Sequence, residues 1–452
     1  MKFMTGYRIT NYHQRAKRKS VRLPLSLVLI CFYFILLSFN GIIVKFIANN
    51  SSLMQLKRIL PEIVLTISAL CMICNRRKNF TFWSTLLLLY TLFIFCIGII
   101  KNGLDDVQIL YLFRDLIFPY FIFSLLGTQS FLAQEKDKFF KILGIIGKIY
   151  LISGCFLGAV EKAMGLEWTA RFYTGYTFYG EDPSTKIRVW TSGSGLRVPG
   201  LTGMSVSFAV YALYYWAILL FTHQNTKGRR LAYNIIWSLL AFLIILFADQ
   251  KTSLVMFVLI LVLSFLYSFE KRDWKNNASI YGVALFLAVF LFAFVYVHKT
   301  NFTFSSIQER LTYWSSFLTT TDWLQIIIPY KATLYGAGGT GFTSVFDNFY
   351  LYLLFSQGLF GLLLFLSCLK NQKEVNKKAT YYFLNLALLI IILLASLTTN
   401  VSQGRSTLAF FSILYPLSNH GTLKKLAISG KKSKSSVSAN SQQRLSRFNT
   451  SN

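Results

Sequence analysis

Apolar stretches of close to twenty residues recur from one end of this chain to the other, and they constrain its fold more than any other feature. About 20 consecutive apolar residues form a helix long enough to cross the hydrocarbon core of a bilayer. Of the 452 residues, 54% are hydrophobic and only 14% are charged, a balance that is not typical of a soluble protein. The stretches are continuously apolar rather than alternating, which argues against a transmembrane β-barrel. The sequence therefore predicts an all-α, multi-pass membrane protein.

The hydropathy pattern predicts about twelve transmembrane helices. Their approximate ranges are 23–44, 59–74, 80–100, 110–132, 142–160, 203–221, 231–248, 253–269, 278–297, 349–369, 379–398 and 406–420. The chain then divides into a basic tail at 1–22, a membrane domain at 23–420 and a Ser-, Lys- and Asn-rich tail at 421–452 that we expect to be disordered. The basic start runs into a full-length span without a small-residue cleavage site, so a cleavable signal peptide is not predicted.

The formal net charge of +29 has a topological cause. The two tails and every second loop hold 30 of the 46 Lys and Arg residues but only 5 of the 17 acidic residues; these segments are 1–22, 75–79, 133–141, 222–230, 270–277, 370–378 and 421–452. The positive-inside rule places them, with both termini, in the cytoplasm. We therefore expect no nucleic-acid partner, and we expect the basic tails to contact anionic membrane lipids.

The cysteines do not indicate a metal or redox site. All six lie in or beside the predicted spans, at positions 31, 71, 74, 96, 155 and 368. Cys71 and Cys74 form a Cys-x-x-Cys pair, but no second pair and no His lies nearby in the sequence. A zinc site needs four such ligands, so packing is the favoured interpretation. We expect no metal, no cofactor and no disulfide framework.

Two predicted extracytoplasmic loops are long, namely 161–202 and 298–348. The first is rich in Tyr, Phe and Trp, which is typical of an interfacial aromatic belt and equally of a surface on which sugars stack. Arg188 and Trp190 are its candidate glycan-binding residues. The second loop carries Arg310 and the Gly-rich run 336–341. That run lacks the Lys-Ser/Thr of a nucleotide-binding loop, so we interpret it as a turn that closes a pocket.

Three polar elements are predicted to converge on the outer face. They are Arg197–Gly200 before the sixth span, Asp249–Ser253 between the seventh and eighth spans, and Asp347–Leu351 followed by Gln357–Gly361 in the tenth. A guanidinium near hydrocarbon is costly unless it faces water, protein or an anion. Pro199 and Gly200 indicate irregular backbone, which must be buried in protein or line a cavity. A cation on such backbone suits a phosphate-bearing lipid.

The order of these motifs resembles that of the O-antigen ligase and Wzy-type polysaccharide polymerase superfamily of membrane glycosyltransferases. The resemblance covers roughly residues 80–420. The family's Arg-x-x-Gly matches Arg197 and Gly200, and its Ser-Arg-Thr/Gly-like turn resembles Gln250-Lys251-Thr252. Its Gly-x-Gly, His-Asn-x-Tyr-Leu and Gly-Leu-x-Gly match Gly339, Gly341, Asn348, Tyr350, Leu351, Gly358, Leu359 and Gly361. Asp347 replaces the family's His, and Lys251 replaces its Arg. These departures favour a capsule or exopolysaccharide polymerase over a ligase.

The resemblance implies a glycosyl transfer at a bacterial plasma membrane. A glycan on undecaprenyl diphosphate is the donor, and a second lipid-linked repeat unit is the acceptor. Arg197, Lys251 and Arg310 would bind the diphosphate, while Asp347 and Arg197 would be catalytic and Tyr350 would contact the glycan. No metal is required where cationic side chains stabilise the leaving group. A flippase and a chain-length regulator of the same pathway are the implied protein partners.

Each candidate residue also has a structural interpretation. Arg197 would snorkel to the interface, Lys251 would end a tight turn, Asp347 would cap a helix and Arg310 would lie on a solvated helix face. Alternative functions are ligase-like transfer to another acceptor, a lipid-linked oligosaccharide flippase or exporter, and a non-enzymatic sensor or scaffold. An exporter needs cations deep in several spans, and only Lys148 is predicted at such a depth. A scaffold would carry a folded cytoplasmic domain, which the sequence does not predict.

Overall fold

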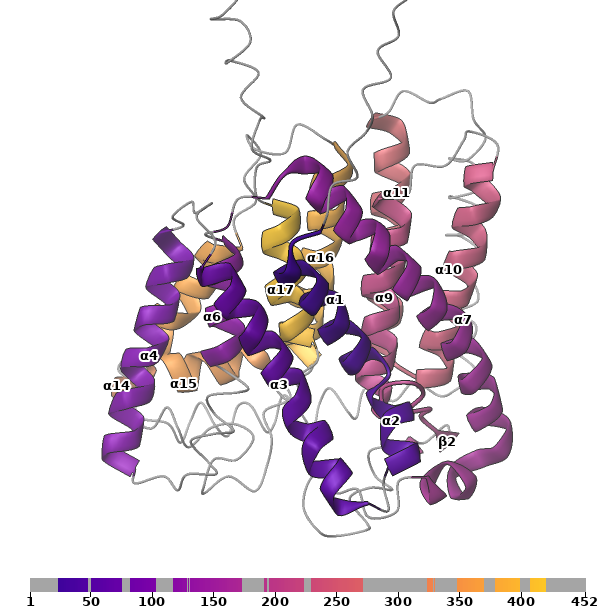
Figure 1. Cartoon of the computed structure of the whole chain (residues 1–452), viewed down its shortest axis with the longest axis horizontal. Coiled ribbons are helices and arrows are strands. Elements are labelled where there is room, and N and C mark those ends of the chain that lie inside the picture. The colour runs from indigo at the N-terminus through magenta and orange to yellow at the C-terminus, as the bar shows by residue number, and fades with distance from the viewer. Residues whose placement is uncertain are drawn as a thin grey trace, which may run out of the picture.

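The structure is a computed structural model in which fourteen stretches of the chain are described. These are residues 23–47, 50–74, 82–102, 117–127, 129, 131–172, 191–192, 195–222, 229–270, 323–327, 329, 348–369, 379–398 and 407–419. Within them the chain is helical, apart from one hairpin of two-residue strands, β1 (Thr191–Ser192) and β2 (Gly195–Leu196). The helices form a bundle whose long members lie roughly side by side (Figure 1). The prediction of an all-α fold is therefore confirmed for the described residues.

The helices follow the predicted spans closely. They are α1 (Leu25–Ser38), α2 (Asn40–Ile47), α3 (Ser51–Ile73), α4 (Phe82–Asn102), α6 (Phe118–Gly127), α7 (Ala133–Arg171), α9 (Ser205–Thr222), α10 (Arg229–Ala248), α11 (Lys251–Glu270), α14 (Trp323–Ile327), α15 (Phe349–Cys368), α16 (Ala379–Thr398) and α17 (Thr407–Asn419). The predicted span at 278–297 lies outside the described residues.

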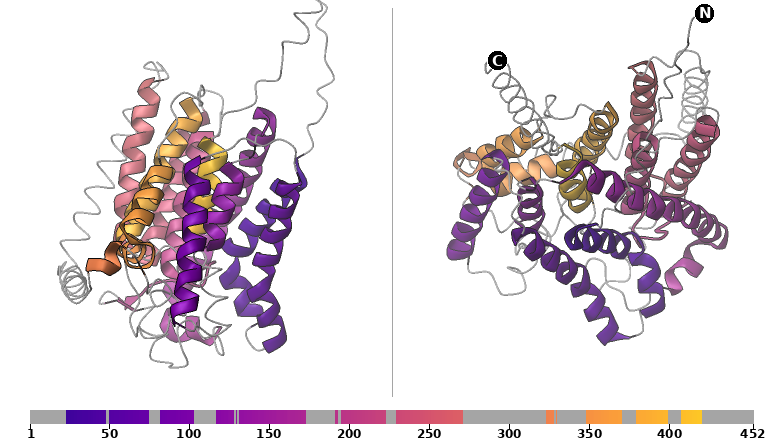
Figure 2. Two further views of the ribbon diagram at one scale, coloured as in Figure 1. Left: turned by 90° about the vertical axis from the view of Figure 1, so that its left-hand side faces the viewer. Right: turned by 45° about the horizontal axis from the view of Figure 1, so that its top comes forward.

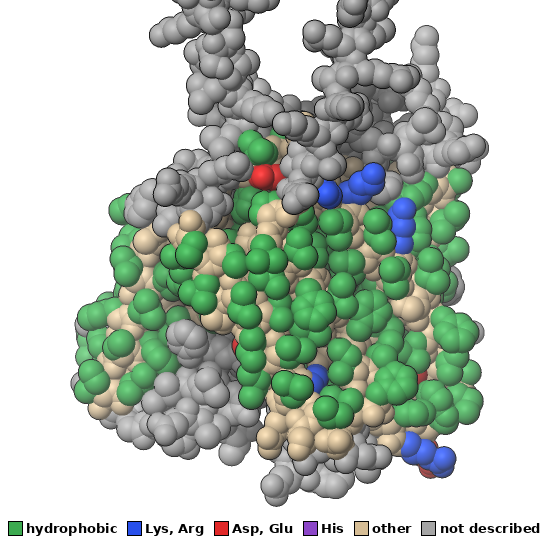
Figure 3. All heavy atoms as spheres, in the orientation of Figure 1, with side chains coloured by type: hydrophobic (Ala, Val, Ile, Leu, Met, Phe, Trp, Pro, Cys, Tyr) green, Lys and Arg blue, Asp and Glu red, His purple; other side chains and the backbone are tan. Residues whose placement is uncertain are grey.

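Among the described residues, four helices are long and apolar enough to cross a membrane, namely α4, α7, α9 and α15. A fifth span results if α1 and α2 are counted together, because they form one apolar stretch bent by 62°. Hydrophobic side chains cover most of the described surface in Figure 3, and the ring of Phe156 on α7 is 74% exposed. An apolar exterior of this extent is what a lipid environment favours. The structure thus supports a membrane protein with several spans.

Several predicted boundaries are wrong, since α3 begins at Ser51 rather than 59 and α6 ends at Gly127 rather than 132. The first span is broken between α1 and α2 rather than continuous over 23–44. Helix α7 has 39 residues and is longer than the predicted span 142–160, so residues 161–171, predicted to lie in a loop, are helical. At about 1.5 Å per residue, α7 exceeds a hydrocarbon core of about 30 Å. A break at Gly165, with φ 83° and ψ −175°, turns its last residues aside.

Helix α9 lies at the centre of the bundle and contacts α7, α10, α11, α16 and α17 (Figure 2). It is apolar and aromatic on all sides, and a helix of that kind is buried all round. The Phe410 ring of α17 stacks on Tyr211 of α9 at 4.0 Å and meets Phe34 of α1 at 4.4 Å. The hydroxyls of Tyr215 and Ser38 share a hydrogen bond of 2.6 Å, so burial leaves them satisfied. The segment that precedes α9 is therefore attached to a helix whose residues are almost all buried.

Candidate functional site

The residues Leu196–Met204, called the Arg197 loop below, join β2 to α9. Gly200 and Gly203 have φ angles of 55° and 83°. Such left-handed angles are readily adopted only by glycine. The Gly203 N–H donates to the Pro199 carbonyl at 3.1 Å, which closes the turn. A Cβ on Gly200 would lie 2.5 Å from the Phe208 ring, so the loop also packs too tightly there for a side chain.

The break in the first span packs directly against this loop. The Gly41 N–H donates to the Leu201 carbonyl at 2.7 Å, and the Asn40 side-chain amide donates to the Thr202 carbonyl at 3.2 Å. The first N–H groups of a helix have no partner within the helix. The Leu201 carbonyl supplies one for α2. A Cβ on Gly41 would lie 2.3 Å from the Gly203 nitrogen, which explains why this break carries a glycine.

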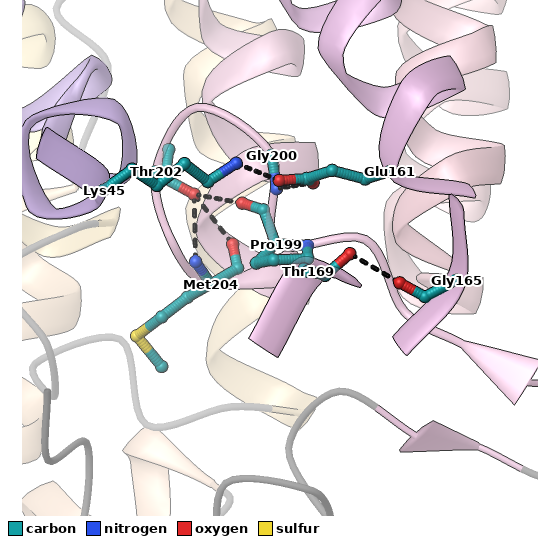
Figure 4. A network of polar contacts seen from close by, with 8 residues as sticks. All are labelled: Lys45, Glu161, Gly165, Thr169, Pro199, Gly200, Thr202 and Met204. Atoms are coloured by element: carbon teal, nitrogen blue, oxygen red, sulfur yellow. Dashed lines mark hydrogen bonds and ion pairs between the residues drawn. The ribbon is translucent and has the colours of Figure 1, made fainter. Parts of the chain in front are cut away.

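Helix α7 holds the loop through two charged side chains, Glu161 and Lys162, and Figure 4 shows the contacts of Glu161. The Glu161 carboxylate accepts the Gly200 N–H at 2.9 Å through one oxygen and pairs with Lys45 of α2 through the other. One residue further on, Lys162 donates to the Leu196 carbonyl at 2.8 Å. Glu161 is fully buried, and the Lys45 side chain is only 10% exposed. The Arg197 loop is therefore held by α2 and by the C-terminal part of α7.

The turn between α10 and α11 is the third support. The Val198 N–H donates to the Phe247 carbonyl at 3.1 Å, and the Gln250 amide donates to the Ser205 hydroxyl at 3.3 Å. Asp249 has a φ of 48°, a left-handed conformation in which Asp is tolerated just after a helix. The structure thus brings together the first two of the three predicted elements, and the second is a turn of two residues followed by α11.

Arg197 has no partner within the described part of the chain. Its side chain is half-buried, and its Nε is buried without a hydrogen bond. The backbone groups on either side of it are bonded, since the Leu196 carbonyl and the Val198 N–H both have partners. An unpaired buried donor on a cation costs free energy unless an acceptor is supplied. The guanidinium is therefore available for an anionic group.

The neighbourhood of the loop carries more positive than negative charge. Among the charged residues that bond to the loop, belong to it or lie in the adjoining α10–α11 turn, the acids Glu161 and Asp249 are outnumbered by Lys45, Lys162, Arg197 and Lys251. Lys251 is exposed at the first residue of α11. A helix N-terminus carries a partial positive charge, so a cation placed there and the N–H groups beside it both favour an anion. The arrangement is suited to bind phosphate groups.

The third predicted element is only partly described. Asp347 lies outside the described residues, as do Arg188, Trp190, Arg310 and the Gly-rich run 336–341. Asn348 is buried and caps α15, because its side-chain oxygen accepts the N–H groups of Tyr350 at 3.0 Å and Leu351 at 3.1 Å. The helix cap considered for Asp347 is thus formed by its neighbour. The Tyr350 hydroxyl donates to the Leu393 carbonyl of α16 at 3.0 Å and so joins two helices.

The Gly-Leu-x-Gly motif has a packing role. Gly358 has φ 70° and ψ 178°, which breaks α15 in its middle. A Cβ there would lie 2.9 Å from the Ile327 carbonyl at the end of α14, and one on Gly361 would lie 3.0 Å from the Tyr90 ring of α4. The Tyr90 hydroxyl donates to the freed Gln357 carbonyl at 2.8 Å. This break, like that between α1 and α2, was not predicted.

Sequence reasoning also missed Glu161 and Lys45. Glu161 was assigned to an outer loop and Lys45 to the edge of the first span, although each is a charged residue at the end of an apolar stretch. Within the described ranges, no three His, Cys, Asp or Glu side chains lie together as metal ligands would. Neither a protein-family model, nor a curated protein, nor a solved structure matches this chain.

Proposed function

We propose that this protein is a polysaccharide polymerase that joins undecaprenyl-diphosphate-linked oligosaccharide repeat units on the outer face of a bacterial plasma membrane. The observation that supports it best is the Arg197 loop. Its backbone is held by three separate elements, while the Arg197 Nε is buried without a partner. The motif order described above supplies the reaction class.

The proposed reaction is a glycosyl transfer. A hydroxyl of the acceptor sugar attacks the anomeric carbon of the donor, the bond from that carbon to the diphosphate oxygen breaks, and lipid diphosphate leaves. The guanidinium of Arg197 binds two phosphate oxygens at once, and Lys251 adds a point charge. Both stabilise charge that grows on the leaving group in the transition state. Asp347 accepts the proton of the attacking hydroxyl, Arg310 adds a further cation, and Arg188, Trp190 and Tyr350 contact the glycan.

The proposal includes twelve spans with both termini in the cytoplasm. It is supported by the uneven distribution of Lys and Arg, and by the presence of a helix at each predicted range except 278–297, which is outside the described residues. In this topology the Arg197 loop and the α10–α11 turn face outward. Substrate that has already been moved across the bilayer then reaches them directly.

Cysteine labelling tests this topology. We expect Gly180→Cys and Thr320→Cys to react with a membrane-impermeant thiol reagent in intact cells, because both lie in the predicted outer loops. Asn225→Cys should react only after the cells are opened. The chain carrying only its six native cysteines is the background control. Labelling of Asn225→Cys in intact cells would invert the topology and place the Arg197 loop inside.

Loss of the protein should leave single lipid-linked repeat units and no long polymer. Lipid extracts from a deletion strain, separated by mass, measure both products. Repeat units trapped on the cytoplasmic leaflet would instead indicate the flippase alternative. Full-length polymer that remains on the lipid carrier would indicate ligase-like transfer to another acceptor.

The exporter alternative is less well supported by the structure. It relied on Lys148, the basic residue predicted deep within a span. The Lys148 Nζ lies 5.2 Å from the centre of the Tyr233 ring and 5.9 Å from that of Trp237, both on α10. An ammonium over aromatic faces is stabilised by them. Lys148 therefore has a packing role between α7 and α10.

A further inference from the structure

Glu161 is a fully buried carboxylate, which is an uncommon choice for a residue that only packs. Its side chain is fully buried, and both carboxylate oxygens are engaged, one by Lys45 and one by the Gly200 N–H at 2.9 Å. Taking a carboxylate and an ammonium out of water costs more than their attraction returns in many proteins, and apolar residues of the same size often serve stability equally well. A role beyond packing is therefore expected for this pair.

The Gly200 N–H that Glu161 accepts lies between two other fixed points of the loop, the Val198 N–H bonded to Phe247 and the Gly203 N–H bonded to Pro199. Gly200 has no Cβ and adopts a φ of 55°, and glycine reaches other backbone angles at little cost. A rotation of the peptide before Gly200 would move the short stretch between these points and shift the backbone beside Arg197. The bond from the Gly200 N–H to Glu161 opposes that rotation.

Lys45 makes this anchor part of a larger unit. Helix α2 contacts the Arg197 loop at two places: its first N–H groups bond to the Leu201 carbonyl, and its Lys45 reaches Gly200 through Glu161 (Figure 4). The Lys45 ammonium also lies 5.8 Å from the centre of the Phe172 ring, just beyond α7. Because α2 contacts the Arg197 loop at two places, it fixes the orientation of the loop; a single contact would allow the loop to rotate about that point.

We infer that Glu161, held by Lys45, is a positioning residue that orients the Arg197 guanidinium toward the donor diphosphate. The inference rests on the proposed function. Glu161 does not contact the substrate, and it acts through the Gly200 N–H. Because small misplacements of a catalytic group lower the rate steeply, loss of this anchor should reduce turnover by about 10- to 100-fold without preventing membrane insertion.

Two double variants separate positioning from burial of charge. In Lys45→Met/Glu161→Gln no charge is left unpaired, and the Gln amide oxygen still accepts the Gly200 N–H. In Lys45→Met/Glu161→Leu no charge is left unpaired either, but the acceptor is gone. We expect the Glu161→Gln double variant (the Gln pair) to polymerise lipid-linked repeat units nearly as the parent protein does, in contrast to the Glu161→Leu double variant (the Leu pair). The Leu pair should insert normally and show a lower kcat with a smaller change in KM. Equal activity of the two pairs would show that Glu161 only fills space.

Hydrogen exchange of the loop gives a second readout that needs no reaction. The amides of residues 196–204 should exchange slowly in the parent protein and the Gln pair, and faster in the Leu pair. If the purified parent protein forms no polymer, the proposed function fails, and the exchange rates still decide whether Glu161 orders the loop. Slow exchange in the Leu pair would overturn the inference whatever the activity is.

Discussion

Replacement of Arg197 by Ala should abolish polymer formation while the protein remains folded and inserted in the membrane. Its Nε has no partner within the described residues, so the substitution breaks no contact that they show. Removal of one donor that stabilises transition-state charge lowers rates by about 100- to 1,000-fold. Polymer length in cell extracts, and kcat with purified lipid-linked repeat units, measure the effect.

Further variants distinguish the two interpretations of Arg197. Arg197→Lys should restore little activity, because the two parallel N–H donors are lost. Lys251→Arg should be tolerated, since it keeps the charge. The control is Lys141→Ala, which removes an exposed positive charge toward the opposite end of α7 and should not affect polymer. Normal polymer in Arg197→Ala would show that the arginine only snorkels to the interface.

Gly200→Ala should destabilise the protein and remove its activity. A Cβ there would lie 2.5 Å from the Phe208 ring, and the φ of 55° is unfavourable for any residue with a side chain. The left-handed backbone costs about 1–2 kcal/mol, and forcing extra volume into a packed site costs about 1–3 kcal/mol. The expected loss is therefore about 2–5 kcal/mol, seen as a lower Tm in detergent and less protein in the membrane.

Gly165→Ala is the comparison variant for this prediction. Gly165 also has a positive φ, of 83°, but a Cβ there would meet nothing within 4 Å. With ψ −175° it lies in a region that essentially only glycine adopts, so its substitution carries a backbone penalty of about 1–3 kcal/mol and no steric clash. We expect Gly200→Ala to lower Tm at least as much, and a clearly larger decrease for Gly165→Ala would mean that the contact with Phe208 contributes little.

The sequence predicted helices far better than it predicted their breaks. Helix α16 begins and ends where hydropathy placed it, because its apolar run is bounded by polar residues on both sides. The hydropathy pattern does not reveal the 62° bend after α1, since the apolar run continues through it. Its signal was the Asn40-Gly41 pair, whose meaning depends on the loop that packs against it. Polar residues at both ends of α7 likewise hid its true length.

The parts of the candidate site that depend on local sequence could be predicted, whereas the contacts between distant residues could not. Arg197, Gly200 and the α10–α11 turn were recognisable from local chemistry, and the structure brings them together. The pairing of Lys45 with Glu161 joins residues 116 positions apart, and one sequence contains no record of such a contact. The cap of α15 was assigned one residue too early, because Asp347 and Asn348 are both good capping residues and only geometry separates them.

The position of Phe410 has a consequence for the order of assembly. This ring meets Phe34 near the beginning of the chain and Tyr211 in its middle, yet it belongs to the last described helix. A chain is synthesised from its N-terminus, so α1 and α9 wait in the bilayer until α17 emerges from the ribosome. Until then the face of α9 that carries Tyr211 and Tyr214 lacks its contact with Phe410. The helix that follows the Arg197 loop can therefore complete its final packing only after α17 has been synthesised.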